Sequence, residues 1–121
     1  MDSNGYNKSL FDTRDGVCWY CHKATDTARH EIFEGVRNRK LSKLTGLWVC
    51  LCPMHHYWAH HDVHIRLNPP LTMKQYLQDK AEQLFKNTYA ADFNHVFYGP
   101  LKNWEIEDLK DEVKEHERKH R

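Results

Sequence analysis

Histidine and cysteine are crowded into one part of this chain of 121 residues. Seven of its ten histidines lie between His22 and His64, and five of them fall in the ten residues from His55 to His64. Imidazole and thiolate are the main protein ligands of transition metals. The crowding therefore predicts that this part of the chain binds metal, and the spacing of the residues indicates how.

The first candidate is a structural zinc site. The pair Cys18-x-x-Cys21 and the pair Cys52-x-x-His55 have the spacing of two zinc knuckles. Three thiolates and one imidazole would complete a tetrahedron without an open position, so the ion would stabilise the fold. Two unrelated pairs of buried residues are the alternative interpretation. Cys50 lies close enough along the chain to compete as a ligand, and we interpret it as a buried thiol that behaves as a small hydrophobe.

A second candidate centre consists of histidines alone. His56 and His60 are four residues apart, and on a helix this spacing places both rings on one face. His30, in a preceding strand, is the expected third ligand. Glu31 follows it and would point to the opposite face of an extended strand, from which it reaches a water only if the strand bends. Two further histidines are alternative ligands: His61 and His64.

The candidate ligands must be positioned by strands and helices, and the hydrophobic pattern predicts both. The expected strands span 29–33 and 47–51, and the expected helices span 36–44, 54–61, 72–86 and 90–97. Gly46 ends the first helix, because glycine suits the left-handed position after a helix. Pro53 suits the first turn of the second helix, and Thr72 with Gln75 forms a capping box for the third. The Asn-Pro-Pro segment at 68–70 is expected to break the chain.

The expected organisation is one α+β domain over residues 17–101, with a flexible lead-in at 1–16 and a charged tail at 102–121. From Trp104 on, seven acidic residues stand against five basic ones. A thin apolar stripe runs through this segment, formed by Ile106, Leu109 and Val113. A solvated helix is the favoured interpretation of the tail. A helix that docks on a partner protein or self-associates is the alternative.

The charge balance excludes a uniformly basic nucleic-acid-binding protein, since 18 Lys and Arg against 17 Asp and Glu leave a formal net charge of +1. From Arg29 to Arg66, however, there are six basic residues and three acidic ones. Four of the basic residues are candidates for contact with nucleic-acid phosphates: Arg37, Arg39, Lys40 and Lys43. No apolar stretch approaches the roughly 20 residues that span a bilayer, and the polar start lacks the pattern of a signal peptide. We therefore expect a cytoplasmic protein with reduced thiols and no membrane partner.

Taken in order, these motifs resemble the HNH endonuclease family, and in particular the small HNH-like proteins of bacteriophages. The central motifs are Cys18-x-x-Cys21, Arg29-His30-Glu31-Ile32-Phe33, and the run Leu47-Trp48-Val49-Cys50-Leu51-Cys52-Pro53-Met54-His55-His56-x-x-x-His60. Weaker similarities are Arg39-Lys40-Leu41-Ser42, Val63-His64 and the segment from Phe93 to Gly99. The resemblance spans about Val17 to Leu101 and does not cover the tail.

The resemblance implies a small zinc-braced ββα-metal domain with additional C-terminal helices. It assigns His30, His56 and His60 to a catalytic divalent ion, which could be Mg2+, Mn2+, Ni2+ or Zn2+, and it places His55 where the family has a cysteine ligand of zinc. The usual general base of the family is a histidine directly after the first ligand, where this chain has Glu31. In an alternative register His30 is the base and Arg29 takes the ligand position. The central asparagine of the family falls near Leu47.

Three functions follow as hypotheses. The first is a phage-encoded, metal-dependent DNA endonuclease, in which His30 or Glu31 takes a proton from the attacking water. A neutral imidazole is the better base near pH 7, whereas ligand geometry favours His30 as a metal ligand. The second is a catalytically inactive, zinc-stabilised protein that binds nucleic acid or protein, such as a recombination factor or an inhibitor of host defence. The third is a structural zinc domain that contacts proteins through its charged tail.

Overall fold

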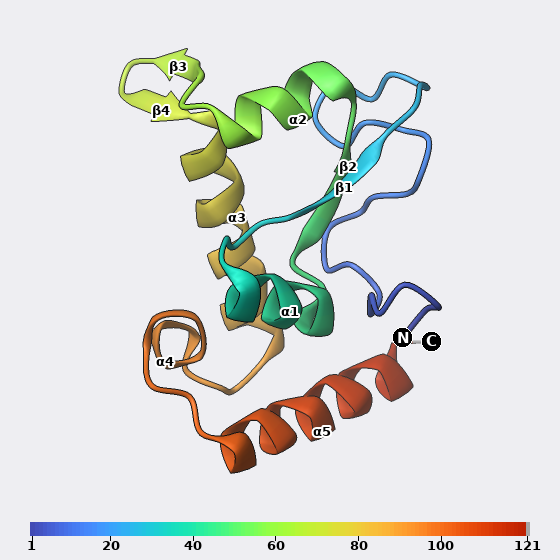
Figure 1. Cartoon of the computed structure of the whole chain (residues 1–121), viewed down its shortest axis with the longest axis vertical. Coiled ribbons are helices and arrows are strands. Elements are labelled where there is room, and N and C mark those ends of the chain that lie inside the picture. Colours follow the sequence, from blue (N-terminus) through green and yellow to red (C-terminus); the bar gives the residue numbers. More distant parts are fainter. Residues whose placement is uncertain (121) are drawn as a thin grey trace.

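The computed structural model describes residues 1–120. Within them, five helices and two small antiparallel sheets confirm the α+β class. In chain order the elements are β1 (Ala28–Glu31), α1 (Val36–Thr45), β2 (Trp48–Leu51), α2 (Pro53–His60), β3 (His64–Leu67), β4 (Pro70–Thr72), α3 (Met73–Thr88), α4 (Phe93–Tyr98) and α5 (Asn103–Lys119). Helix α2 and the β3–β4 hairpin lie at one end of the molecule, and α5 lies across the other (Figure 1).

Strands β1 and β2 form the sheet that carries both candidate metal centres. They are antiparallel, with His30 opposite Val49, and every residue of β2 is buried. Helix α1 connects them and ends at Gly46, whose φ of 78° is left-handed. Strand β2 then leads through Cys52, the N-cap, directly into α2. Two paired strands followed by a helix therefore form the unit on which the site is built.

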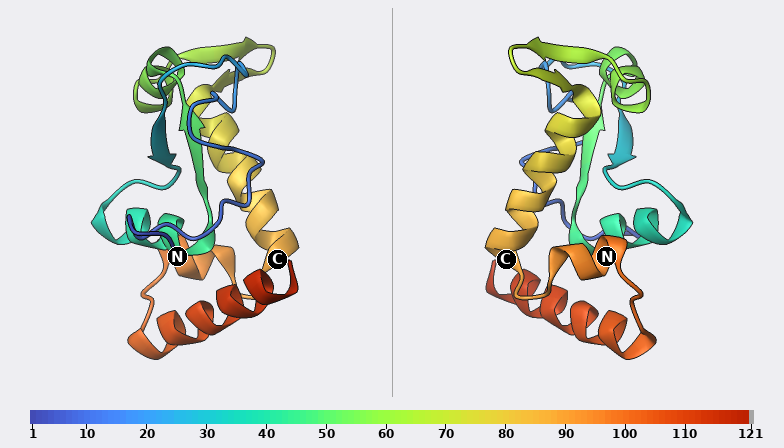
Figure 2. Two further views of the ribbon diagram at one scale, coloured as in Figure 1. Left: turned by 90° about the vertical axis from the view of Figure 1, so that its right-hand side faces the viewer. Right: turned by 90° about the vertical axis from the view of Figure 1, so that its left-hand side faces the viewer.

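Helix α3 packs against the core with one buried face. The predicted capping box is present, because the Thr72 hydroxyl accepts from the N–H of Gln75 and the Gln75 side chain accepts from the N–H of Thr72. The buried residues of α3 follow the helical period: Met73, Leu77, Ala81 and Phe85. They pack with the strands and α4 in one core cluster. Figure 2 shows α3 running from the β3–β4 end toward α5.

Two segments differ from the expected elements. The region expected only to break the chain forms the β3–β4 hairpin, whose second strand begins at Pro70; a two-stranded sheet has only edge strands, which tolerate proline. Helix α4 begins at Phe93 and not at 90, because Asp92 accepts from the N–H of Asn94 as the N-cap. None of the helices within the described residues is long and apolar enough to cross a membrane.

The flexible lead-in expected over residues 1–16 instead packs on the domain. Phe11 is only 4% exposed and belongs to the core. The side-chain amide of Asn7 donates to the carbonyl oxygen of Leu44 at 2.7 Å, and the N–H of Leu10 donates to that of Gly46 at 2.8 Å. The lead-in therefore closes one side of α1 and of the loop that follows it.

The tail is helical, as expected, but the favoured interpretation of a solvated helix is wrong. Leu109 and Val113 in α5 are each only 2% exposed, and the helix contacts α1. The carboxylate of Glu112 accepts from the N–H groups of Ala90 and Ala91 at 2.5 and 3.3 Å. Two residues of the thin apolar stripe are thus buried within the chain itself, and the third, Ile106, is half-buried.

Candidate metal centres

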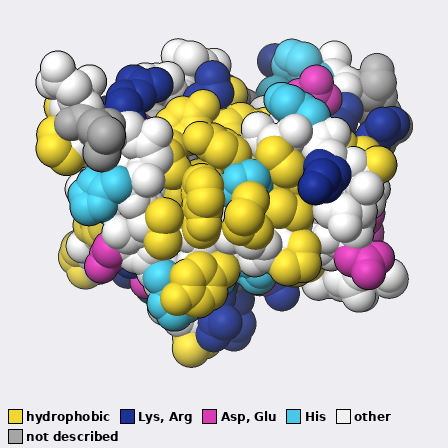
Figure 3. Space-filling view, turned by 90° about the horizontal axis from the view of Figure 1, so that it is seen from above, with side chains coloured by type: hydrophobic (Ala, Val, Ile, Leu, Met, Phe, Trp, Pro, Cys, Tyr) yellow, Lys and Arg dark blue, Asp and Glu magenta, His cyan; other side chains and the backbone are white. Residues whose placement is uncertain are grey.

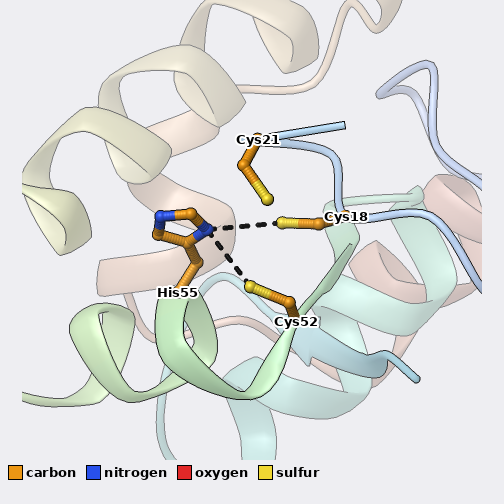
Figure 4. A group of neighbouring side chains, drawn as sticks. All are labelled: Cys18, Cys21, Cys52 and His55. Carbon is orange, nitrogen blue, oxygen red and sulfur yellow. Dashed lines mark hydrogen bonds between the residues drawn. The ribbon is translucent and has the colours of Figure 1, made fainter. Parts of the chain in front are cut away.

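Four side chains converge at the end of the molecule where β2 meets α2. Cys18 and Cys21 come from the loop before β1, Cys52 caps α2, and His55 lies in the first turn of α2. Their ligand atoms all lie within 4.8 Å of one another. The Nδ1 atom of His55 is 3.6 Å from the Cys18 sulfur and 3.2 Å from the Cys52 sulfur (Figure 4). The structure therefore brings together the four residues predicted to bind structural zinc.

The geometry of this Cys3His cluster suits a zinc ion. For tetrahedral zinc, bond lengths of about 2.3 Å to sulfur and 2.0 Å to nitrogen give an S···N separation of about 3.5 Å, close to both distances. Burial would raise the pKa of the Cys18 thiol, but backbone N–H groups and the His55 ring outweigh it and lower this pKa to about 6. Burial and the neighbouring Cys18 sulfur raise the pKa of Cys52. A cation bound between these sulfurs would stabilise them as thiolates.

Aromatic rings shield the cluster on its outer side. The rings of Tyr20 and Trp58 contact the His55 ring, with centroids 4.8 and 4.6 Å from it. Viewed from this end, hydrophobic side chains gather across the middle of the face (Figure 3). These rings hold the imidazole of His55 in place, as neighbours of a metal ligand commonly do, while Cys21 stays exposed to solvent.

Cys50 does not compete for the site, although it is only two residues from Cys52. It is completely buried in β2, and its thiol donates to the Asp15 carboxylate at 3.4 Å. Burial and this hydrogen bond raise the pKa of the Cys50 thiol. The strand ends at Leu51, so the chain has turned into the helix cap at Cys52. The interpretation of Cys50 as a buried thiol agrees with these contacts.

The second group consists of His30 from β1 and His56 and His60 from α2, with ligand nitrogens within 4.8 Å of one another. The Nε2 atoms of His56 and His60 are 3.0 Å apart. Their separation on a tetrahedral ion would be about 3.3 Å. His30 is buried, His56 is half-buried and His60 is exposed. The group is therefore open to solvent on one side, as three-ligand catalytic metal sites are.

Burial favours the neutral form of the two less exposed histidines of this cluster. Burial, followed by the charges of His60 and His56, lowers the pKa of His30 to about 3. Burial and the charge of His60 likewise lower the pKa of His56. Neutral imidazoles offer the free lone pairs that metal ligation requires. The residues present can therefore hold a divalent ion and leave a coordination position for a second molecule.

Glu31 and Arg29 are engaged by partners outside the histidine cluster, although the charge of Glu31 acts to raise the pKa of His56. The Tyr6 hydroxyl donates to the Glu31 carboxylate at 3.0 Å, and the Lys43 ammonium lies 3.8 Å from it. Arg29 forms ion pairs with Asp2 and Asp15, each at 2.7 Å. In β1 these two residues flank His30, so they lie on the opposite face of the strand. The geometry favours His30 as a ligand over the register in which Arg29 takes that role.

The two alternative histidines lie outside the cluster. His61 is exposed and stacks on Tyr57, with ring centroids 4.0 Å apart. His64 is exposed at the start of β3. A residue that sequence reasoning missed is Lys74, in the first turn of α3, whose charge contributes to lowering the pKa of His30. Its ammonium pairs with Glu34 at 3.1 Å. Nothing in the sequence pattern links α3 to this cluster.

The four basic residues expected to contact phosphates are divided between two roles. The Arg37 guanidinium donates to the carbonyl oxygen of Val96, and Lys43 lies over the Tyr6 ring at 4.8 Å. Arg39 and Lys40 are exposed on α1. The first two therefore also serve the fold, while Arg39 and Lys40 project into solvent beside β1.

Comparison of the chain with protein-family models, with curated proteins and with solved structures gives no match. Function must therefore be inferred from the site itself.

Proposed function

We propose that this protein is a metal-dependent DNA endonuclease of the HNH type, phage-encoded, acting in the cytoplasm of a bacterial host and braced by a structural zinc. One observation carries the proposal. His55 and His56 are neighbours in α2, yet the first belongs to the Cys3His cluster and the second to the histidine cluster. A closed four-ligand group beside an open three-ligand group is the arrangement expected of a structural and a catalytic ion in one small domain.

The residues around the histidine cluster suit the handling of a phosphodiester. A divalent ion held there would stabilise developing charge on the phosphate and lower the pKa of water. His30, His56 and His60 would hold it. The charge of Lys74, which pairs with Glu34 at 3.1 Å, reaches His30, and Arg39 is exposed on α1 for contact with neighbouring phosphates.

The proton-accepting role expected of His30 or Glu31 is not supported by their contacts. The His30 ring joins the ligand group, and Tyr6 and Lys43 hold the Glu31 carboxylate. We therefore assign His30 to metal binding and Glu31 to anchoring the lead-in and α1 against β1. An ion held by His30, His56 and His60 would then supply the activation of water.

The test combines metal content with plasmid nicking. Purified protein is analysed for zinc and then assayed with Mg2+, Mn2+, Ni2+ and Zn2+. His56→Ala should abolish nicking, by at least about 100-fold, while the far-UV circular dichroism spectrum and the bound zinc are unchanged. His61→Ala is the matched control at the end of the same helix and should nick as the wild type does. A wild-type protein that nicks with none of these ions would reject the endonuclease proposal.

A catalytically inactive, zinc-stabilised accessory protein is the second candidate. It is favoured by Leu47, which lies where the HNH family has its central asparagine and is completely buried. A recombination factor or an inhibitor of host defence would bind nucleic acid or protein without cleavage. Zinc-loaded protein that binds DNA in a mobility-shift assay but never nicks it would support this candidate over the first.

A further inference from the structure

A groove of about 720 Å³ lies between α1, α5 and the start of the lead-in, away from both candidate metal centres. Its apolar lining includes Leu41 and Leu44 from the core side of α1 and Ile106 from α5. Val36, at the first position of α1, also lines it and is 68% exposed. Val36 therefore extends the apolar lining of the groove to the surface, and contiguous apolar surface of this kind is what marks an interaction site.

The polar lining of the groove has one sign of charge. Four cationic side chains line it: Arg37, Lys40, Lys43 and Lys110. Two of them have acidic partners outside the lining, Lys43 with Glu31 at 3.8 Å and Lys110 with Glu107 at 3.2 Å. No aspartate or glutamate is among the described residues that line it, although the chain as a whole has 17 acidic residues. The first turn of α1 also lacks an acidic residue, so nothing there offsets the positive end of the helix dipole. The groove thus combines an apolar floor with basic side chains, of which Arg37 and Lys40 form no ion pair among the described residues.

We infer that this groove binds an acidic amphipathic helix of a partner protein, independently of any nuclease activity. Such a helix presents aliphatic side chains along one stripe and carboxylates beside it, which complements both the floor and the charge of the groove. A nucleic-acid backbone would complement the charge but not the aliphatic floor. A second copy of this chain is a poor occupant, because the apolar residues of its own acidic helix, Leu109 and Val113, are already buried.

The probe is a fluorescein-labelled synthetic helix with Leu at i, i+3, i+4 and i+7 of each repeat and Glu elsewhere. Fluorescence anisotropy with the full chain should give a Kd on the order of 10 μM that weakens as salt is added. Peptides with Lys in place of Glu, or Ser in place of Leu, should bind at least about tenfold more weakly. Equal binding of either comparison peptide would overturn the inference.

Two variants test the two halves of the groove. Val36→Ser should weaken binding about fivefold, through loss of apolar contact, and Lys110→Glu about tenfold, through charge reversal. Their matched controls are Met54→Ser, at a 55% exposed site on α2, and Lys80→Glu, at an exposed site on α3; both should leave the affinity unchanged. Peptide affinity that is the same in all four variants would exclude the groove as the binding site.

The outcome is separable from that of the endonuclease test. Val36→Ser and Lys110→Glu should nick DNA as the wild type does, and His56→Ala should bind the peptide normally. If a short DNA duplex binds in a manner that requires Lys110 while the peptide does not bind, the groove is a nucleic-acid surface and the inference fails. If sedimentation shows that the wild type is a dimer and that Val36→Ser is a monomer, the groove binds a second copy of this chain and the inference of a different partner protein fails.

Discussion

At the scale of single residues, the neighbours His55 and His56 belong to two different candidate metal centres. The His55 ring points to the cysteine sulfurs behind a shell of aromatic rings, while the His56 ring faces His60 and solvent. Adjacent residues on a helix differ in direction by about 100°, so one turn of α2 can serve both centres. We therefore expect substitutions in the Cys3His cluster to lower stability, and substitutions in the histidine cluster to lower the proposed nicking activity.

Replacing a thiolate of the Cys3His cluster should unfold the protein. Cys21→Ser is expected to lose zinc and native circular dichroism at about 37 °C, because the binding free energy of a structural ion is part of the folding free energy. The matched control is Cys50→Ser, which removes a thiol outside the cluster and should retain zinc in the same molar ratio as the wild type. A folded Cys21→Ser protein free of zinc would exclude a structural ion.

The carboxylate of Glu31 provides a second test at this scale. If it anchors Tyr6 and Lys43, Glu31→Gln should nick DNA within about threefold of the wild type and lose about 0.5–1.5 kcal/mol of unfolding free energy. A general base would behave differently, since its loss typically lowers the rate by about 100-fold or more. Nicking rates and urea unfolding measured on the same preparation decide between the two roles, and a large loss of rate with unchanged stability would restore Glu31 as the base.

At the scale of elements, the junction between α1 and β2 depends on a close approach of two backbones. A Cβ atom on Gly46 would lie 2.4 Å from the carbonyl oxygen of Lys8. The φ angle of Gly46 is also left-handed, a conformation that side-chain-bearing residues rarely adopt. The lead-in, α1 and β2 meet at this point. Their packing sets the position of β2, and through Cys52 the start of α2.

Gly46→Ala should therefore destabilise the fold by about 2–4 kcal/mol, through backbone strain and the displacement of Lys8. Gly16→Ala is the matched control, because its φ of +86° is also left-handed but no atom lies within 4 Å of the added Cβ. Gly16→Ala should therefore lower the free energy of unfolding only by the backbone strain, about 1–2 kcal/mol. Thermal unfolding followed by circular dichroism measures both, and equal losses in the two variants would show that the close contact contributes nothing.

At the scale of the whole molecule, α5 completes the core at the end opposite to the metal centres (Figure 2). Leu109→Ala should lower the unfolding free energy by about 2–4 kcal/mol, as expected for a buried leucine. Trp104→Ala, at a 63% exposed position of the same helix, should change it by less than about 0.5 kcal/mol. Urea unfolding tests both, and a neutral Leu109→Ala would mean that the tail is a solvated helix after all.

The sequence by itself determined the features that depend on local spacing. Ligands three or four residues apart on a helix face one way whatever surrounds them, so the spacing alone pairs Cys52 with His55 and His56 with His60. The capping box at Thr72 and the periodic stripe of α3 were predictable for the same reason: their interactions join residues within a turn or two of each other.

Only the tertiary structure decided which residues that lie far apart in the sequence come into contact. The contact of Tyr6 with Glu31, the burial of Phe11, the proximity of Lys74 to His30 and the docking of α5 have no local signal. Each depends on which apolar surfaces find one another when the core forms, and a polar lead-in or a charged helix can be solvated or buried with the same local pattern. The role proposed for Glu31 therefore had to come from the folded chain, whereas the members of the two candidate ligand groups were predictable from their spacing.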